Sequence, residues 1–168
     1  MTSSLCFRPL AGGNTVKEIR LLREPFTPGT FVGPFTNAHP GLGGVCTFVG
    51  EVRGDAHGEG GVKALELLHY EPLTMPGMQA LADHALERFD LMGILMLHRV
   101  GILHPGEPIV CVSACARHRR AAIEAVDFTM DHLKSDAWFW KREKRADGWH
   151  WIEPRAADHA DLARWAQD

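Results

Sequence analysis

The chain lacks the features that mark secreted, membrane-spanning and nucleic-acid-coating proteins. Only four of its 168 residues are cysteines, and their uneven spacing does not suit a disulfide framework. No stretch approaches the roughly 20 apolar residues that a membrane span needs, and residues 1–13 lack the basic start and apolar run of a secretion signal. The net charge of −3 argues against general adhesion to nucleic acid. We therefore expect a soluble, cytoplasmic protein held together by packing.

What the chain does contain is ordinary globular composition. With 45% apolar and 23% charged residues, it is long enough to bury one substantial core. Residues 1–14 mix Ser, Gly, Pro and Asn without periodicity, so we expect them to form a flexible N-terminal arm. Residues 15–168 contain no internal repeat or low-complexity tract and are expected to form a single domain.

The first half of the chain predicts strands at 17–26, 43–53 and 62–70. Segment 28–38 is either a helical turn or a loop. The glycine-rich segment 54–61 lacks large apolar groups, so we expect it to be a flexible hairpin connection. This connection would make 43–53 and 62–70 a long antiparallel pair.

The second half of the chain alternates helices with hairpins. Apolar residues recur at helical spacing in three segments: 76–89, 119–134 and 158–165. A Pro-Gly turn predicts a hairpin of 93–100 with 108–116, and an Asp-Gly turn predicts a hairpin of 138–144 with 149–153. Strand pairs that alternate with single helices indicate an α+β fold with mainly antiparallel sheets.

Positive charge is concentrated in one region of an otherwise acidic chain. Residues 117–145 hold eight Lys or Arg against five Asp or Glu, a balance of +3, whereas the remainder balances to −6. The same region contains Trp138, Phe139 and Trp140 between two lysines, Lys134 and Lys141. A cationic pocket concentrates anions and holds them more strongly when water is excluded. We expect this region to bind a small phosphorylated ligand or a carboxylate tail.

The two lysines have both a structural and a functional interpretation. Lys134 ends a predicted helix, where the helix dipole stabilises a cation. Lys141 shares a strand face with Phe139 and Glu143, so Lys141 and Glu143 could form an exposed ion pair. The functional alternative places both ammonium groups in one cleft, where desolvation and mutual repulsion lower at least one pKa and yield an amine able to act as acid, base or nucleophile. The sequence leaves both interpretations open.

Other basic residues are candidates for the same site. His118, Arg119 and Arg120 mark a change from strand to helix, where free backbone N–H groups and guanidinium groups can cradle a phosphate. The alternative is a solvated basic turn. Arg53 ends its strand and is placed to close a site from the side, and Arg155 follows the last hairpin. Taken alone, Arg53 is more often a surface residue than a site residue, and Arg155 alone indicates neither.

Two further hypotheses have less support. The chain has ten histidines, yet no short pair of zinc ligands recurs in a matched second half, so we expect no metal site. Cys111 and Cys115 should point to the same face of one strand, too far apart for easy bridging. The aromatic run at 138–140 could stack nucleobases, but core packing is the more frequent use of such residues.

Four runs of the sequence form a specific combination: GGVCTFVGEVR (43–53), LHRVGILHPGE (97–107), ARHRRAAIEAVDFTMDHLKSDAWFWKRE (116–143) and WIEPR (151–155). Together these runs resemble the large, catalytic subunit of molybdopterin synthase. The resemblance covers about residues 43–165, and its HR…MDxLK…FWKRE combination is too specific for a chance match.

The resemblance implies a sulfurtransferase of molybdenum cofactor biosynthesis that converts cyclic pyranopterin monophosphate to molybdopterin. The sulfur donor would be a small ubiquitin-like carrier subunit ending in a Gly-Gly thiocarboxylate, so no cofactor is implied. The family forms a homodimer that binds two carriers, which makes a heterotetramer. The implied fold is an α/β hammerhead-like core with antiparallel sheets and an additional small antiparallel sheet, and residues 15–168 would be one such catalytic-subunit domain.

The resemblance also implies roles for single residues. Lys134 matches a catalytic lysine beside the carrier's terminal carbonyl, and Lys141 matches a second catalytic lysine beside the pterin. The other matched positions bind substrate or line its pocket: Arg53, His118, Arg119, Met130, Glu143 and Arg155. Among them, Arg53 and the His118-Arg119 pair would bind the precursor and its phosphate. Arg155 would be supplied across the dimer, and Met130 and Glu143 would line the pocket.

The chain departs from the family pattern in three places. Segment 70–78 has a few extra residues, Arg117 replaces a small residue, and Trp138 stands where proline is common. Arg117 and Trp138 bear on how a carrier tail is gripped, which leaves the choice of partner open. Two other functions also stay open. One is a non-catalytic carrier-binding or assembly subunit. The other is a nucleic-acid-binding module, which would require strongly salt-dependent binding of oligonucleotides.

Overall fold

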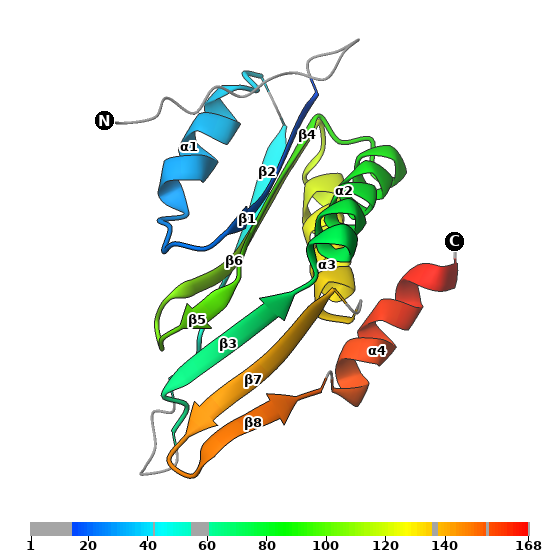
Figure 1. Ribbon diagram of the computed structural model, residues 1–168. Coiled ribbons are helices and arrows are strands. Elements are labelled where there is room, and N and C mark those ends of the chain that lie inside the picture. The colour runs from blue at the N-terminus through cyan, green and yellow to red at the C-terminus, as the bar shows by residue number, and fades with distance from the viewer. Residues whose placement is uncertain (1–14, 42, 55–60, 136–137, 154, 168) are drawn as a thin grey trace.

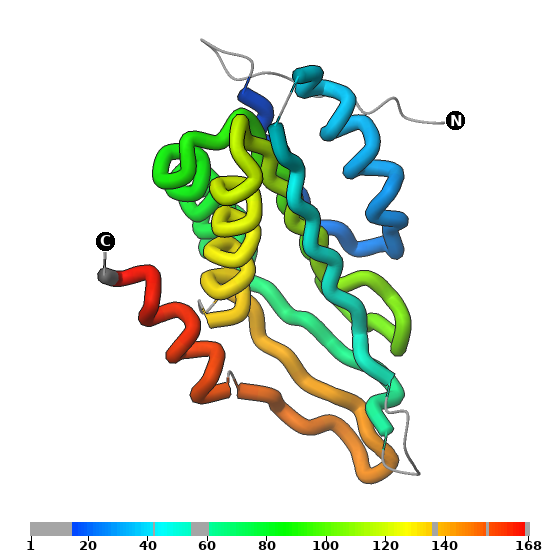
Figure 2. The backbone as a smooth tube through the Cα atoms, turned by 180° about the vertical axis from the view of Figure 1, so that it is seen from behind, coloured from blue at the N-terminus to red at the C-terminus, as the bar shows by residue number. Residues whose placement is uncertain are grey.

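The structure is a computed structural model that describes residues 15–41, 43–54, 61–135, 138–153 and 155–167. Within these residues, two four-stranded sheets lie end to end along the molecule (Figure 1). The first sheet has helix α1 on one face and helices α2 and α3 on the other, as the opposite view also shows (Figure 2). The predicted α+β class is confirmed. The expected arm at 1–14 lies outside the described residues.

The first sheet has the strand order β1-β4-β6-β2. Its strands are β1 (Val16–Leu22), β4 (Gly93–Arg99), β6 (Pro108–Ala116) and β2 (Gly44–Glu51). Strands β4 and β6 pair antiparallel, as the predicted hairpin requires, and β1 pairs parallel to β4. Every residue of β4 is buried, as expected for a central strand with both faces covered.

The second sheet is antiparallel, with the order β5-β3-β7-β8. Its strands are β5 (Gly101–Leu103), β3 (Ala64–His69), β7 (Phe139–Arg145) and β8 (Gly148–Ile152). The predicted Asp-Gly hairpin is confirmed as β7 and β8, with Gly148 at a positive φ of 129°. At Gly101, where φ is 93°, the chain passes from the first sheet into the second.

The predicted pairing of 43–53 with 62–70 is wrong. Strand β2 pairs with β6 in the first sheet, whereas β3 pairs with β5 and β7 in the second. The physical reason is burial, because Leu65 and Leu67 of β3 pack with Leu103 in a separate apolar cluster. The segment between β2 and β3 therefore connects two sheets and is not a hairpin turn. Half of this segment, residues 55–60, lies outside the described residues.

One predicted helix, 76–89, begins earlier than expected, and the other helices stay close to their predicted limits. Helix α1 (Gly29–Asn37) settles the choice left open for 28–38, and α3 (Arg119–Ser135) matches its prediction closely. Helix α2 (Glu71–Arg88) begins five residues before the predicted start at Pro76. Proline is compatible with a first helical turn, where the backbone N–H has no intrahelical partner, so Pro72 does not stop the helix. Helix α4 (Ala156–Ala163) continues into a 3₁₀ turn, Arg164–Gln167.

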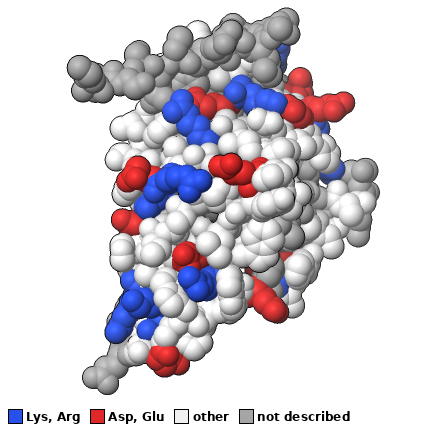
Figure 3. Space-filling view, in the orientation of Figure 1, with Lys and Arg blue, Asp and Glu red and all other residues white. Residues whose placement is uncertain are grey.

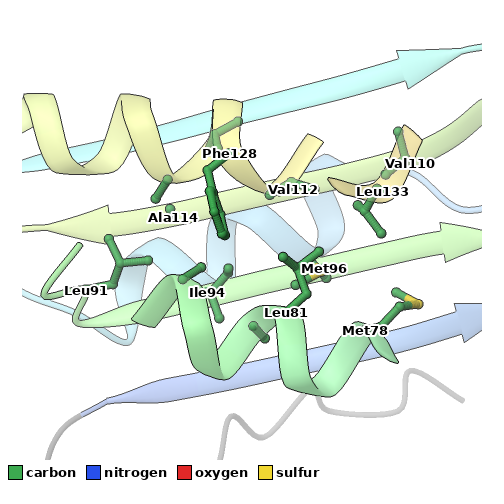
Figure 4. Packing of buried hydrophobic residues seen from close by; sticks show 14 of the residues in the cluster. Met78, Leu81, Leu91, Ile94, Met96, Val110, Val112, Ala114, Phe128 and Leu133 are labelled. Atoms are coloured by element: carbon green, nitrogen blue, oxygen red, sulfur yellow. The ribbon is translucent and has the colours of Figure 1, made fainter. Parts of the chain in front are cut away.

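Alternation along β4 explains the two layers of the core. Ile94 and Met96 pack under α2 and α3, where they meet Leu81 and Phe128 (Figure 4). Their neighbours on the other face, such as Leu95, pack in a separate cluster that lies under α1. That second cluster also buries Cys111 and Cys115, which share one strand face as predicted, and burial raises the pKa of these thiols to about 11 and about 12.

A ring stack joins the two sheets. Phe139, the first residue of β7, belongs to the main core cluster and stacks on His98 of β4 with ring centroids 3.9 Å apart. This contact holds the start of β7 against the end of the first sheet. No helix in the described part of the chain is long and apolar enough to cross a membrane.

Candidate active site

A pocket of about 690 Å³ lies where the end of β2, the second sheet and the last turns of α3 meet. It collects six of the eight residues predicted for the site: Arg53, Met130, Lys134, Lys141, Glu143 and Arg155. Arg155 reaches the pocket from its own chain, although the resemblance implied that a second copy would supply it. Basic side chains from four separate segments therefore converge on one cavity.

Helix and strand geometry together place the two lysines. Met130 and Lys134 are four residues apart, so they share the face of α3 that meets the pocket. On β7, alternation turns Phe139, Lys141 and Glu143 to one face. Phe139 is buried in the core and Trp140 is 44% exposed, so Lys141 points inward and away from the exposed tryptophan.

The surroundings of Lys141 favour a reactive amine. Burial lowers the pKa of Lys141 below its ordinary value, the neighbouring Lys134 ammonium lowers it further, and the Asp158 carboxylate opposes both. Lys134 is half-exposed, with its Nζ 3.8 Å from Asp158 Oδ1. The Glu143 carboxylate accepts a hydrogen bond from Arg145 at 2.9 Å. The arrangement thus matches the shared-cleft interpretation better than an exposed pair of Lys141 with Glu143.

His98 lines the same pocket and was not singled out from the sequence. It is 5% exposed, and its Nδ1–H donates to the carbonyl of Arg99 at 2.8 Å. Burial lowers its pKa to about 4, and Lys141 lowers it as well, so the ring is neutral near pH 7 with Nε2 as an acceptor. The signal available was its place in the run LHRVG, within a strand-like apolar segment. A stack on a residue 41 positions away cannot be read from that segment.

His118 and Arg119 do not join this pocket within one chain. They are exposed at the start of α3, fifteen residues before Lys134, and a helix rise of 1.5 Å per residue separates the two ends by roughly 22 Å. The described residues hold no group of three or more His, Cys, Asp or Glu side chains that could bind a metal ion. What the pocket offers is lysine and arginine nitrogens, which suit phosphate and carboxylate oxygens.

Fold and pocket together define an α+β protein with two lysines paired in a cationic cavity. A profile of the MoaE protein family matches residues 21–136, and the chain belongs to this family. A molybdopterin synthase catalytic subunit from Caulobacter vibrioides is 43% identical over 150 residues, which cover 89% of this chain and 98% of that one.

Solved structures agree with this assignment. A molybdopterin biosynthesis MoaE protein from Burkholderia ambifaria superimposes with a TM-score of 0.75 at 36% identity, over 90% of this chain and 99% of that one. A protein–protein complex of subunits 1 and 2 of the molybdopterin-converting factor from Helicobacter pylori contains a chain of the same fold. Its TM-score is 0.68 at 17% identity, over 82% of this chain and 91% of that one.

Proposed function

We propose that this chain is the catalytic subunit of a molybdopterin synthase. It transfers sulfur from the C-terminal thiocarboxylate of a small carrier subunit to cyclic pyranopterin monophosphate. The observation that carries the proposal is the meeting of Lys134 and Lys141 in one pocket with Arg53 and Arg155. Family membership and the Caulobacter relative, named for this activity, support it.

The pocket suits both reactants because each brings negative charge. The precursor carries a phosphate, the carrier tail carries a thiocarboxylate, and sulfur attack develops further negative charge. Cations already fixed in place stabilise that transition state more than the separated reactants. Lys134, half-exposed at the rim, is placed for the carrier tail, and the more buried Lys141 is placed for the pterin. Sulfur arrives already activated on the carrier, so the proposal includes no metal or redox cofactor.

A second copy of the chain completes the proposed site. His118 and Arg119 match phosphate-binding positions, yet α3 holds them roughly 22 Å from Lys134. A homodimer can bring these residues of one protomer to the pocket of its partner, and one carrier at each pocket gives a heterotetramer. We place the complex in the cytoplasm, where the free thiols of Cys46, Cys111 and Cys115 would stay reduced.

The decisive experiment is reconstitution. Purified protein, thiocarboxylated carrier and cyclic pyranopterin monophosphate should yield the dithiolene product. Lys141→Ala should lower its rate of formation by about 100-fold or more, the usual contribution of a general acid or base. Lys134→Ala should lower it similarly. Lys144→Ala is the matched control, because Lys144 lies on the same strand and is exposed.

The outcomes separate the remaining alternatives. Carrier binding without product from the unmodified protein would identify a non-catalytic assembly subunit. Strongly salt-dependent oligonucleotide binding would identify a nucleic-acid-binding module. On the face shown in Figure 3, Lys and Arg side chains are interspersed with Asp and Glu, which does not favour a nucleic-acid surface there.

A further inference from the structure

Asp158 contacts three residues at the edge of the pocket through its side chain and its backbone carbonyl. Its Oδ2 accepts a hydrogen bond from the backbone N–H of Arg155 at 2.9 Å, and its Oδ1 lies 3.8 Å from Lys134 Nζ. Its backbone carbonyl accepts a hydrogen bond from Ser135 Oγ at 3.0 Å. Asp158 therefore joins the end of α3 to the start of α4 and to the pocket arginine.

Among the charged groups around Lys134 and Lys141, Asp158 has a distinct electrostatic role. From β7, Glu143 faces the pocket but its carboxylate is engaged by Arg145. From β4, His98 is neutral near pH 7. The remaining charged groups that line the pocket are Glu51, Arg53 and Arg155. Asp158 is the carboxylate whose charge raises the pKa of Lys141, against burial and Lys134.

We propose that Asp158 is a positioning residue of this pocket, which fixes the Arg155 backbone with one carboxylate oxygen and holds the Lys134 ammonium with the other until an anionic substrate replaces it. The proposal rests on the function proposed above. At 3.8 Å the ion pair is longer than a hydrogen bond, and Lys134 is 54% exposed. Such a pair is weak, so a phosphate or thiocarboxylate can displace Asp158 from Lys134 at little cost.

The far end of the C-terminal segment is held independently. Arg164 pairs with Asp127 at 2.9 Å and with Asp131 at 2.7 Å, and Trp165 Nε1 donates to Asp131 at 2.7 Å. Loss of the Asp158 charge therefore leaves the segment anchored on α3. A change in the titration of Lys141 can then be distinguished from detachment of α4.

The test is the titration of Lys141 in the substrate-free protein, followed by NMR of its side chain. Asp158→Asn keeps an oxygen acceptor for the Arg155 N–H and removes the charge, so the Lys141 midpoint should move to lower pH. Asp161→Asn, on the same helix one turn further, removes an equal charge and should leave the midpoint unchanged. An unmoved midpoint in Asp158→Asn, or an equal shift in Asp161→Asn, would overturn the proposal.

A second measurement tests whether Asp158 competes with inorganic phosphate for Lys134. If Asp158 competes for Lys134, Asp158→Asn should bind inorganic phosphate about two- to fivefold more tightly by calorimetry, the range expected for a weak ion pair. Equal or weaker binding would count against the proposal. Both measurements omit carrier and pterin, so they stand even if sulfur transfer fails.

Misfolding of the variant would not end the test. If circular dichroism shows that Asp158→Asn is misfolded, the contact between Lys134 and Asp158 can be tested in the unmodified protein. NMR should detect a through-space contact between the side-chain protons of Lys134 and those of Asp158, and the absence of that contact would reject the proposal.

Discussion

At the scale of single residues, His98 ties the stability of the protein to pH. Its folded pKa of about 4 lies below the ordinary 6.5, so the unfolded chain binds the extra proton more readily. The stabilisation is fully present above pH 6.5 and is lost as the pH falls from 6.5 towards 4. A shift of this size corresponds to about 3 kcal/mol of unfolding free energy.

His98→Gln should remove this dependence. The variant keeps a polar, neutral side chain, so its unfolding free energy should fall by about 3 kcal/mol less between pH 7 and pH 4 than that of the unmodified protein. Urea titrations at both pH values measure the difference. His104→Gln, an exposed histidine beyond β5, should behave like the unmodified protein. Parallel slopes in all three proteins would contradict the assigned pKa.

The residues of the site were predictable to the extent that sequence motifs carry them. Lys134 and Lys141 could be paired from the MDxLK…FWKRE runs, and strand alternation correctly turned Lys141 away from Trp140. The motifs could not show which of these residues lie close together in space. His118 and Arg119 are close to Lys134 in the sequence pattern but are kept apart by the rigid length of α3. His98 escaped notice because its stack with Phe139 forms between two sheets.

At the scale of elements, helix α2 and the start of β7 fit each other through one glycine. A Cβ on Gly77 would lie 2.5 Å from the Trp138 ring, and Thr74 Oγ1 donates to the Trp138 carbonyl at 2.8 Å. Trp138 and segment 70–78, which contains Gly77, are two of the three departures noted from the sequence. These two meet in space, and the absence of a side chain at Gly77 leaves room for the Trp138 ring.

Gly77→Ala should therefore destabilise the protein. Alanine in a helix normally stabilises by about 1 kcal/mol relative to glycine, but the clash with Trp138 should outweigh this and give a net loss of about 1–3 kcal/mol. Urea unfolding measures it. In the Trp138→Ala background the clash is absent, so Gly77→Ala should become neutral or stabilising. A stabilising effect in both backgrounds would show that Trp138 yields freely.

Elements with local signals and the two hairpins with clear turn signals were predicted well, whereas the partners of β2 and β3 were not. The apolar stripe of α3 and the Asp-Gly turn between β7 and β8 depend on neighbouring residues, and both are confirmed. The pairing of β2 with β3 failed because strand partners are chosen by burial across the whole molecule, and nothing within 43–70 signals the sheet to which each strand belongs. The start of α2 was misplaced because Pro76 was taken as its first residue, whereas the helix begins at Glu71, accommodates Pro72 in its first turn and continues through Pro76.

At the scale of the whole molecule, the two sheets share buried residues. Phe139 of the second sheet belongs to the main cluster under α2 and α3. Ile109 of β6 packs against that cluster and also against the small cluster of the second sheet. Only Val100 separates β4 from β5, so the backbone also passes between the sheets without a linker. The pocket lies at this junction, and its lysines stay together only while both sheets are folded.

Residues 15–168 should consequently unfold in one transition. Trp140, Trp149 and Trp151 lie in the second sheet, whereas Trp138 and Trp165 pack against the main cluster. With Trp138 and Trp165 replaced by phenylalanine, fluorescence reports on the second sheet, and far-UV circular dichroism reports mainly on the helices that cover the first sheet. Urea curves from the two probes should coincide, because loss of either sheet exposes the core of the other. Phe139→Ala should lower the unfolding free energy by about 3–5 kcal/mol. Both curves should therefore shift together to a lower urea midpoint. Trp140→Phe, at an exposed position one residue on, should leave the midpoint nearly unchanged. A fluorescence transition that precedes the dichroism transition would instead divide the chain into two units, and the pocket would then open before the first sheet unfolds.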